Sequence, residues 1–218
     1  MSQPITIVLV DDQMLMREAL ALRLSQEAGF RVLATVRDAD AAVREAELHK
    51  PDVVLMDIDM PGRCCFDAAR LIAAASPETA ILFVSAFCHD RYIEEALAAG
   101  AAGYLTKDES PQTLIAAIHA ARAGSAYYSP EIAARVVADG AGLRLSQSTN
   151  ARVSTLTPRE LEILRYIARG MSRKEIARTR QVSEKTVVNH TSNLMNKLNI
   201  HDRVDLTRFA IREGLATA

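Results

Sequence analysis

The chain has 218 residues, of which 49% are hydrophobic, enough for a protein that folds around a core of its own. Its three cysteines, two of them adjacent at Cys64 and Cys65, exclude a disulfide framework and indicate a reducing compartment. No run approaches the roughly 18 apolar residues of a membrane span, and the first residues lack a basic leader, so we expect a cytoplasmic protein with no membrane partner.

The net charge of −1 is the sum of two opposite parts. Residues 1–150 carry 13 Lys and Arg against 20 Asp and Glu, a difference of −7, whereas residues 151–218 carry 13 against 7, a difference of +6. The basic part is a candidate for binding a polyanion, nucleic acid before membrane, although a solvated basic face would carry the same charge. This division indicates two regions with different partners.

In the first 123 residues, short apolar runs alternate with alanine-rich helical stretches. The runs that predict strands are ITIVLV (5–10), VLATV (32–36), VVLMD (53–57), AILFVS (80–85) and GYLT (103–106). The helices are predicted from Met14 to Ala28, from Asp38, after Phe66, from Asp90 and from Ser110. Five βα units in a row predict an α/β fold, a five-stranded doubly wound parallel sheet whose ligands bind at the carboxyl ends of the strands.

Chemically reactive residues stand at the ends of four of these strands. They are Asp11 and Asp12 after the first, Asp57 at the end of the third, Ser85 at the end of the fourth and Lys107 after the fifth. Each alone could be a helix cap, a turn residue or a surface charge, but together they share one edge of the sheet. Three carboxylates repel one another unless a divalent cation, most simply Mg²⁺, neutralises them. Such a site suits a phosphoryl group, with Asp57 as nucleophile and with Lys107 and Ser85 on the phosphoryl oxygens.

The segment after residue 128 changes character. SPEIAARVVA predicts a short helix from Ser129, and residues 139–155 predict a linker, because they have little periodicity and many small or polar residues. Everything after Thr155 is predicted to be helical.

Helix-start signals recur in this last part. Thr157 with Glu160 and Ser172 with Glu175 form two capping boxes, and Ser183 caps a third helix. Two short helices followed by a longer one predict a helix-turn-helix unit, whose longer helix enters the DNA major groove. Periodicity alone would also suit an ordinary amphipathic helix with a polar solvent face.

The motifs of the N-terminal part resemble those of the receiver domain of bacterial two-component response regulators. The segments that carry the resemblance are VDD (10–12), MDIDMPG (56–62), SA (85–86) and GYLTK (103–107). The resemblance implies a flavodoxin-like receiver with Asp57 as phosphoacceptor, Ser85 and Lys107 on the phosphoryl oxygens, and Tyr104 as an aromatic switch that turns inward when Ser85 moves. It also implies a sensor histidine kinase as phosphodonor and Mg²⁺ as cofactor. The implied Mg²⁺ site consists of Asp11 through water, Asp12 and Asp57 directly, and the backbone carbonyl of Asp59.

One loop departs from that pattern. After Pro61 and Gly62 the family usually has an acid and then a glycine, whereas this chain has Arg63, Cys64 and Cys65. Losing that glycine would remove backbone freedom beside Asp57 and alter the lifetime of the phosphate. A redox input through Cys64, Cys65 and Cys88 is conceivable, although free cysteines are most often small packing residues.

The C-terminal part resembles the LuxR-type DNA-binding domain, through LTPRELEILRYIARGMSRKEIA (156–177) and VSEKTVVNHTSNLMNKLNI (182–200). Together with a receiver, this resemblance identifies the chain as a member of the NarL/FixJ class of response regulators. It implies base-facing positions at Val188, Asn189 and Ser192, where Val188 replaces a lysine that the family often has. It implies DNA backbone contacts at Lys174, Lys185, Thr186 and Lys197. The final helix, from Arg203 to Glu213, would supply a dimer contact.

We therefore expect a phosphorylation-controlled transcription factor that is not an enzyme, binds double-stranded promoter DNA and dimerises when active. The expected domains are a receiver over 1–124, a short helix and linker over 125–154, and an all-α helix-turn-helix domain over 155–218. One alternative keeps DNA binding but makes the receiver independent of phosphorylation. Another is a haloacid dehalogenase-type phosphatase, because Asp57 and Asp59 form an Asp-x-Asp pair, but that class has the pair on its first strand and would leave the basic part unexplained.

Overall fold

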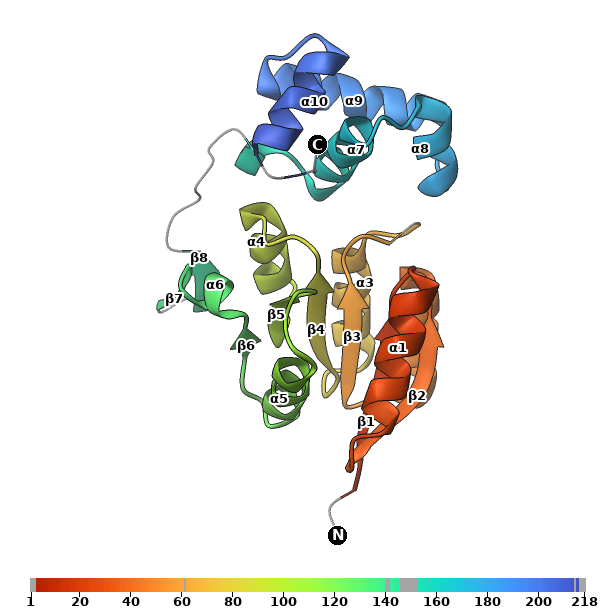
Figure 1. Cartoon of the computed structure of the whole chain (residues 1–218), viewed down its shortest axis with the longest axis vertical. Helices are drawn as coiled ribbons and strands as arrows, with labels where there is room; N and C mark the ends of the chain where they lie inside the picture. Colours follow the sequence, from red (N-terminus) through yellow and green to blue (C-terminus); the bar gives the residue numbers. More distant parts are fainter. Residues whose placement is uncertain (1–2, 61, 140–141, 146–152, 214, 216–218) are drawn as a thin grey trace. The chain divides into compact units, whose positions relative to one another are not determined.

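The computed structural model describes residues 3–60, 62–139, 142–145, 153–213 and 215. The chain divides into two compact units, one made of residues 1–88 and 93–146 and the other of residues 89–92 and 147–218. The N-terminal unit is an α/β structure and the C-terminal unit is built mainly of helices (Figure 1).

The N-terminal unit is built on a parallel sheet with the strand order β2-β1-β3-β4-β5-β6 (Figure 1). The strands are β1 (Ile5–Val10), β2 (Phe30–Val36), β3 (Val53–Asp57), β4 (Ala80–Ser85), β5 (Gly103–Thr106) and β6 (Tyr127–Tyr128). The prediction of five strands was therefore one short. The additional strand β6 has only two residues, paired with Gly103 and Tyr104 of β5, and so short a strand has no periodicity that a sequence could reveal.

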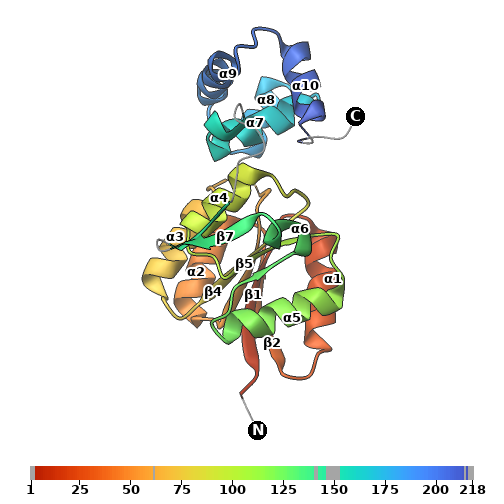
Figure 2. The ribbon, with the colours of Figure 1, turned by 90° about the vertical axis from the view of Figure 1, so that its left-hand side faces the viewer.

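Helices cover both faces of this sheet, as a doubly wound fold requires. They are α1 (Met14–Ser25), α2 (Ala39–His49), α3 (Cys65–Ala75), α4 (Asp90–Ala98) and α5 (Pro111–Arg122). Helices α1 and α5 lie on one face, and α2, α3 and α4 lie on the other (Figures 1 and 2). On the first face, Ile7, Leu55 and Leu82 of the strands pack with Leu114 and Ile118 of α5. The predicted α/β class and doubly wound sheet are thus confirmed.

Local signals in the sequence explain where the elements begin. The Asp38 side chain accepts a hydrogen bond from the Ala41 amide and caps α2, and Ser110 caps α5 by accepting one from the Thr113 amide. Proline stands at the first position of α5, where the missing N–H group has no helical partner to lose. All five residues of β3 are buried, as expected of a strand covered on both faces.

The segment after α5 differs from its prediction. The helix expected from Ser129 through residue 138 is limited to α6 (Pro130–Ala133), and the chain then forms an antiparallel pair of strands, β7 (Val136–Asp139) and β8 (Gly142–Leu145). The two adjacent β-branched valines explain the change, because they favour a strand over a helix. Of the expected linker, residues 140–141 and 146–152 lie outside the described residues, and residues 153–155 form a short 3₁₀ turn.

The C-terminal unit has the expected helix-turn-helix order of two shorter helices followed by a longer one. Its helices are α7 (Pro158–Ala168), α8 (Arg173–Thr179), α9 (Glu184–Leu198) and α10 (Arg203–Arg212). Both predicted capping boxes are present, at Thr157 with Glu160 and at Ser172 with Glu175. The core of the unit is formed by Leu161, Leu164, Ile176, Val187, Leu194, Leu198, Leu206 and Phe209.

None of the helices that the structure describes is long and apolar enough to span a bilayer.

Candidate functional site

An acidic cluster lies at the carboxyl edge of the sheet, where β1 and β3 run side by side. Asp11 follows β1 and Asp57 ends β3, and the two strands pair directly, with Val10 opposite Met56. Carboxylate oxygens of Asp11, Asp12 and Asp57 lie within 4.8 Å of one another. Because β2 lies on the other side of β1, this is the point where the strand order reverses, the place at which open α/β sheets bind ligands.

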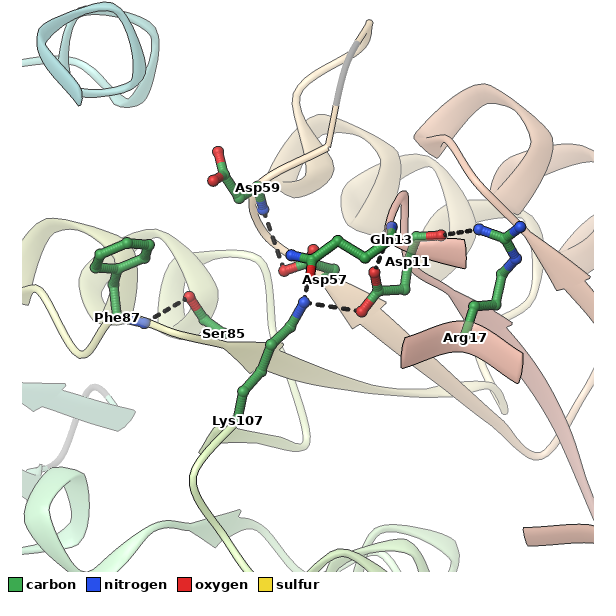
Figure 3. A network of polar contacts seen from close by, with 8 residues as sticks. All are labelled: Asp11, Gln13, Arg17, Asp57, Asp59, Ser85, Phe87 and Lys107. Atoms are coloured by element: carbon green, nitrogen blue, oxygen red, sulfur yellow. Dashed lines mark hydrogen bonds and ion pairs between the residues drawn. The ribbon is translucent and has the colours of Figure 1, made fainter. Parts of the chain in front are cut away.

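Lys107 brings a positive charge into this cluster. Its Nζ lies 2.8 Å from Asp11 Oδ2 and 2.9 Å from Asp57 Oδ2 (Figure 3). The lysine follows β5, which is separated from β3 by β4, and its own amide donates to the Ser85 carbonyl at 2.7 Å. Parallel pairing of β3, β4 and β5 therefore brings residues 57, 85 and 107 to one edge.

The cluster perturbs the ionisation of its members. Burial, reinforced by the charges of Asp57 and Asp11, raises the pKa of Asp12 to about 6. Burial also raises the pKa of Asp57, against the opposing effect of Lys107. Burial would lower the pKa of Lys107, but its ion pairs with Asp57 and Asp11 outweigh this and raise it. The site thus holds more negative charge than one lysine neutralises, and its three carboxylates are the oxygen ligands that Mg²⁺ prefers.

Ser85 and Asp59 lie beside this cluster. The Ser85 side chain is fully buried, and its Oγ accepts a hydrogen bond from the Phe87 amide at 3.1 Å (Figure 3). The Asp59 amide donates to Asp57 Oδ1 at 3.3 Å. The roles of Ser85 as a phosphoryl contact and of the Asp59 carbonyl as a metal ligand stay predictions.

Tyr104 is fully buried in this structure, and its role as an aromatic switch stays a prediction. Its hydroxyl donates to the Phe87 carbonyl at 2.5 Å, in the loop that follows Ser85. The tyrosine and the serine therefore bind the carbonyl and the amide of one residue, Phe87. This arrangement links β5 to the loop between β4 and α4.

Sequence reasoning missed two residues that hold the loop after β1. Arg17, in the first turn of α1, donates to the Asp11 backbone carbonyl at 2.7 Å, and the Gln13 amide donates to Asp11 Oδ1 at 2.8 Å (Figure 3). Asp11 and Asp12 are not side-chain caps of α1, whose N-cap residue is Gln13. The only signal in the sequence is an arginine six residues after Asp11, and a hydrogen bond to a backbone carbonyl leaves no pattern.

The loop that departs from the family pattern has ordinary backbone geometry. Gly62 has φ of +83°, a value that favours glycine, whereas Cys64 has φ of −63° and ψ of 130° and stands at the N-terminal cap position of α3. Arg63 is exposed and forms an ion pair with Asp40 at 2.5 Å. Position 64 therefore needs no glycine here, because any residue adopts this extended backbone, and the effect of the loop on the lifetime of the phosphate stays a prediction.

The cysteines do not form a reactive group. Cys64 and Cys65 are buried at the start of α3, and Cys88 is partly buried and donates from Sγ to Glu131 Oε1 at 3.1 Å. Burial and the Glu131 contact raise the pKa of Cys88, which lowers its thiolate fraction. These observations favour packing over the redox role considered from sequence.

Helix α9 presents a polar face that the core does not use. Val187, Leu194 and Leu198 are buried, while the opposite positions are exposed. The exposed residues include Lys185, Val188, Asn189, Ser192, Asn196 and Lys197. Amide side chains can pair with adenine edges and a valine can touch a thymine methyl group, so this face is suited to a DNA groove.

The residues predicted to contact the DNA backbone have different surroundings. Lys174 and Lys185 are exposed. Thr186 is partly buried, and its Oγ1 lies 2.8 Å from the hydroxyl of Ser183, the N-cap residue of α9. Lys197 Nζ lies 2.7 Å from Glu160 Oε2, so this lysine also stabilises the start of α7. All seven DNA contacts predicted from the sequence stay predictions.

Comparisons with known proteins assign both units. Residues 7–119 match the family described as response regulator receiver domain, and residues 154–210 match bacterial regulatory proteins, luxR family. The chain is 37% identical over 213 residues to the uncharacterized transcriptional regulatory protein YxjL of Bacillus subtilis, covering 97% of each chain. It is 34% identical over 218 residues to the response regulator UvrY of Escherichia coli K12, covering 98% of this chain and 97% of that one.

The fold is also found among solved structures. A LuxR-family two-component response regulator from Aurantimonas sp. SI85-9A1 matches with a TM-score of 0.58 and 34% sequence identity, covering 61% of this chain and 94% of that one. The predicted resemblance is thus confirmed over both units. The chain belongs to the two-component response regulators of the NarL/LuxR family, in which a receiver domain is joined to a LuxR-type helix-turn-helix DNA-binding domain.

Proposed function

We propose that this response regulator is controlled by phosphorylation of Asp57 and that the modified form binds promoter DNA as a homodimer. The observation that carries this is the buried Asp57 carboxylate, 2.9 Å from Lys107 and grouped with Asp11 and Asp12. A buried carboxylate at the switch point of an α/β sheet, next to a cation, is placed to act as a nucleophile. The basic C-terminal unit then supplies the output.

The phosphodonor is a phosphohistidine on a sensor histidine kinase. A carboxylate oxygen of Asp57 attacks its phosphorus, a P–O bond forms, and the P–N bond breaks with its electron pair on the departing imidazole. The product is an aspartyl phosphate, and no substrate is turned over. Asp11, Asp12, Asp57 and the carbonyl of Asp59 would hold Mg²⁺, which when bound neutralises the carboxylates and the phosphoryl oxygens.

Lys107 has a second function once the phosphoryl group is present. Its ammonium group contacts Asp11 and Asp57 and can donate to a phosphoryl oxygen from nearly the same position. The Ser85 hydroxyl accepts from the Phe87 amide, so its O–H can donate to another phosphoryl oxygen when the hydroxyl turns toward Asp57. Phosphorylation adds about −1.5 to −2 charge units at the site and so favours the arrangement in which both groups point toward Asp57.

DNA binding follows from the exposed face of α9. Val188, Asn189 and Ser192 read bases in the major groove, and Lys174, Lys185, Thr186 and Lys197 contact the backbone. Helix α10 supplies the dimer contact, so the DNA site has two related halves. The regulator works in the cytoplasm, where promoter DNA is accessible.

The test compares the full chain with Asp57→Asn, an isosteric change that removes the nucleophile. Binding to genomic DNA fragments is measured at fixed salt, with and without acetyl phosphate and Mg²⁺. We expect acetyl phosphate to raise the affinity of the unaltered chain and to leave that of Asp57→Asn unchanged. Equal affinities of both proteins in the presence of the phosphodonor would count against control through Asp57.

The two alternatives have different signatures in the same preparations. A receiver that works without phosphorylation would form no base-labile acyl phosphate with acetyl phosphate and Mg²⁺, yet would bind DNA. A haloacid dehalogenase-type phosphatase would release inorganic phosphate with steady turnover. That alternative has less support, because Asp57 ends the third strand and Asp59 follows it, whereas that class has the pair on its first strand.

A further inference from the structure

The chain segment that follows α5 contacts two loops, one after β4 and one after β5. These loops follow Ser85 and contain Lys107, the two residues that we propose contact the phosphoryl group. We call residues 127–135 the strap; it contains β6, the N-cap residue Ser129 and helix α6, and it lies at the edge of the sheet farthest from β2 (Figure 1). The strap leads directly into β7, and therefore toward the DNA-binding unit along the chain. Its contacts suggest a mechanical role that the phosphoacceptor motifs do not include.

The first set of contacts joins the strap to the end of β5. Tyr127 and Tyr128 pair with Gly103 and Tyr104 in parallel register. The Ser129 amide donates to the Tyr104 carbonyl at 3.0 Å, and Ser129 Oγ accepts from the Thr106 amide at 3.1 Å. Ser129 is only 1% exposed, so these bonds are shielded from water. The residue after Thr106 is Lys107, so the strap holds the backbone that aims this lysine.

The second set joins the strap to the loop between β4 and α4. Arg135 Nη1 donates to the Cys88 carbonyl at 2.9 Å, and the Cys88 thiol donates to Glu131 Oε1 at 3.1 Å. Cys88 is three residues from Ser85 and follows Phe87, whose amide and carbonyl bind the Ser85 and Tyr104 hydroxyls. The guanidinium contact is charge-assisted, which makes it stronger than a neutral hydrogen bond.

The strap has an apolar anchor that limits independent movement. Ile132, in the middle of α6, is fully buried, and the amides of residues 132 and 133 donate back to the Ser129 carbonyl. A movement of the Cys88 carbonyl must therefore either break the Arg135 bond or displace the strap. The strap is thus hydrogen-bonded at both ends of α6. Ser129, before the helix, contacts the end of β5, and Arg135, after the helix, contacts the loop between β4 and α4.

We propose that the strap transmits the phosphorylation-dependent movement of the β4–α4 loop to the chain that leads to the DNA-binding unit, with Arg135 as the positioning residue. The inference rests on the proposed function, because the movement begins when the Ser85 hydroxyl turns toward the phosphoryl group. Arg135 keeps the Cys88 carbonyl in register with the strap while that loop moves. The coupling is reciprocal, so a strap that is held in one position also restrains Ser85.

The experiment measures amide hydrogen exchange by mass spectrometry in the full chain, with Mg²⁺, before and after acetyl phosphate. In the unaltered protein we expect exchange to change in peptides from residues 85–90 and also in peptides from residues 127–139. In Arg135→Ala we expect the change at residues 85–90 to persist and the change at residues 127–139 to be lost. Arg135→Lys retains one charged donor and should restore part of it.

Two controls separate coupling from general damage. Arg44 is exposed on α2, and Arg44→Ala should respond as the unaltered chain does. Cys88→Ala removes only the thiol contact and leaves the carbonyl that Arg135 binds, so its strap should still respond. A thermal melt of each variant verifies folding, and Arg135→Lys carries the test if Arg135→Ala does not fold.

Each outcome has one meaning. A strap response that survives in folded Arg135→Ala, or loop changes without any strap response in the unaltered chain, would overturn the role of the strap. The absence of any acetyl phosphate effect at residues 85–90 in the unaltered chain, with Asp57→Asn behaving identically, would overturn the proposed function instead. A change in exchange at residues 127–139 in the unaltered chain, together with its loss in Arg135→Ala, would support the role of the strap and the proposed function.

Discussion

At the scale of single residues, one lysine shared by two buried carboxylates dominates the candidate site. Lys107 contacts Asp11 and Asp57, while partial burial, reinforced by the charges of Asp57 and Asp11, raises the pKa of Asp12 to about 6. An arrangement that keeps acids ionised against their mutual repulsion lowers the stability of the fold. The cluster is therefore a place where we expect function and stability to oppose each other.

Asp12→Asn tests this opposition. The change removes one unfavourable charge without changing the size of the side chain. The free energy of unfolding of the N-terminal unit should therefore rise at pH 7 without Mg²⁺. Because solvent screens the charge of this exposed residue, the rise should be only about 1 kcal/mol. Millimolar Mg²⁺ should stabilise the unaltered chain more than the variant. The measurement is urea denaturation, with Glu47→Gln on the exposed side of α2 as the control. A variant less stable than the unaltered chain without Mg²⁺ would contradict the repulsion.

At the scale of elements, short hydrogen-bonded pieces hold the ends of the longer ones. The two-residue strand β6 packs so closely on β5 that a Cβ atom at Gly103 would lie 2.1 Å from the Tyr127 carbonyl oxygen. In the C-terminal unit, Glu160 completes the capping box of α7 and also pairs with Lys197 of α9. In both units, a few contacts determine how one element ends against another.

Gly103→Ala should be one of the most damaging small changes in the chain. The added methyl group overlaps backbone and the Leu82 side chain, so we expect a loss of about 3 kcal/mol in the free energy of unfolding of the N-terminal unit. Gly100→Ala is the matched control: it has φ of +71° but open space around a Cβ atom, and should cost only about 1 kcal/mol of strain. Equal losses in urea denaturation would mean that β6 can move away freely.

Glu160→Gln tests the electrostatic part of the C-terminal unit. Burial opposes ionisation, but the hydrogen bonds from Lys197 and Thr157 outweigh it and lower the pKa of Glu160 below its ordinary value of 4.5. Its contribution to stability is therefore fully present above pH 4.5 and is lost as the pH falls through the lowered pKa.

Glutamine keeps the hydrogen bond of the capping box but not the charge. We expect a loss of up to about 1 kcal/mol at pH 7 and a flatter dependence of stability on pH below 4.5, measured as thermal midpoints from pH 3 to pH 7. Glu175→Gln removes the same charge from a fully exposed capping box without a lysine partner and should have the smaller effect at pH 7. Superimposable pH curves for Glu160→Gln and the unaltered chain would show that the charge of Glu160 does not stabilise the C-terminal unit.

At the scale of the whole molecule, the chain separates an acidic part from a basic part. Residues 1–150 have a difference of −7 between basic and acidic residues, and residues 151–218 have a difference of +6. The acidic part groups three carboxylates at the carboxyl edge of the sheet, while the basic part presents α9 with exposed lysine and amide side chains. Opposite charges thus suit the two binding events that we propose, a cation at the acidic cluster and DNA at α9.

Two substitutions on α9 distinguish backbone contact from base contact. Lys185→Ala should weaken binding about equally for all DNA fragments and reduce the slope of log affinity against log salt by about 1.

Asn189→Ala should cost about 1–3 kcal/mol of binding free energy on the tightest fragment and change the ranking among fragments. Titrations at several salt concentrations measure both. An unchanged ranking for Asn189→Ala would remove this residue from the base-reading set.

Much of the fold could be predicted from local patterns. The alternation of apolar runs and helical stretches indicated the doubly wound sheet, and capping residues such as Asp38, Ser110 and Ser172 marked helix starts within a residue or two. The helix expected over 129–138 was wrong beyond Ala133, since Val136 and Val137 joined a strand pair. These signals succeed where the determinant is a side chain acting on its nearest neighbours in the chain.

The sequence by itself determined which residues stand at the strand ends, because parallel strands bring their carboxyl ends to one edge whatever the details of packing. Only the tertiary structure decided that Lys107 binds both Asp11 and Asp57, that Arg17 holds the Asp11 carbonyl, and that Arg135 holds the Cys88 carbonyl. Those contacts join residues whose separation in space is set by how strands and helices pack, and two of them end on backbone atoms that every residue carries. A hydrogen bond to such an atom leaves no trace in the identity of its partner, so it becomes visible only when the chain is folded.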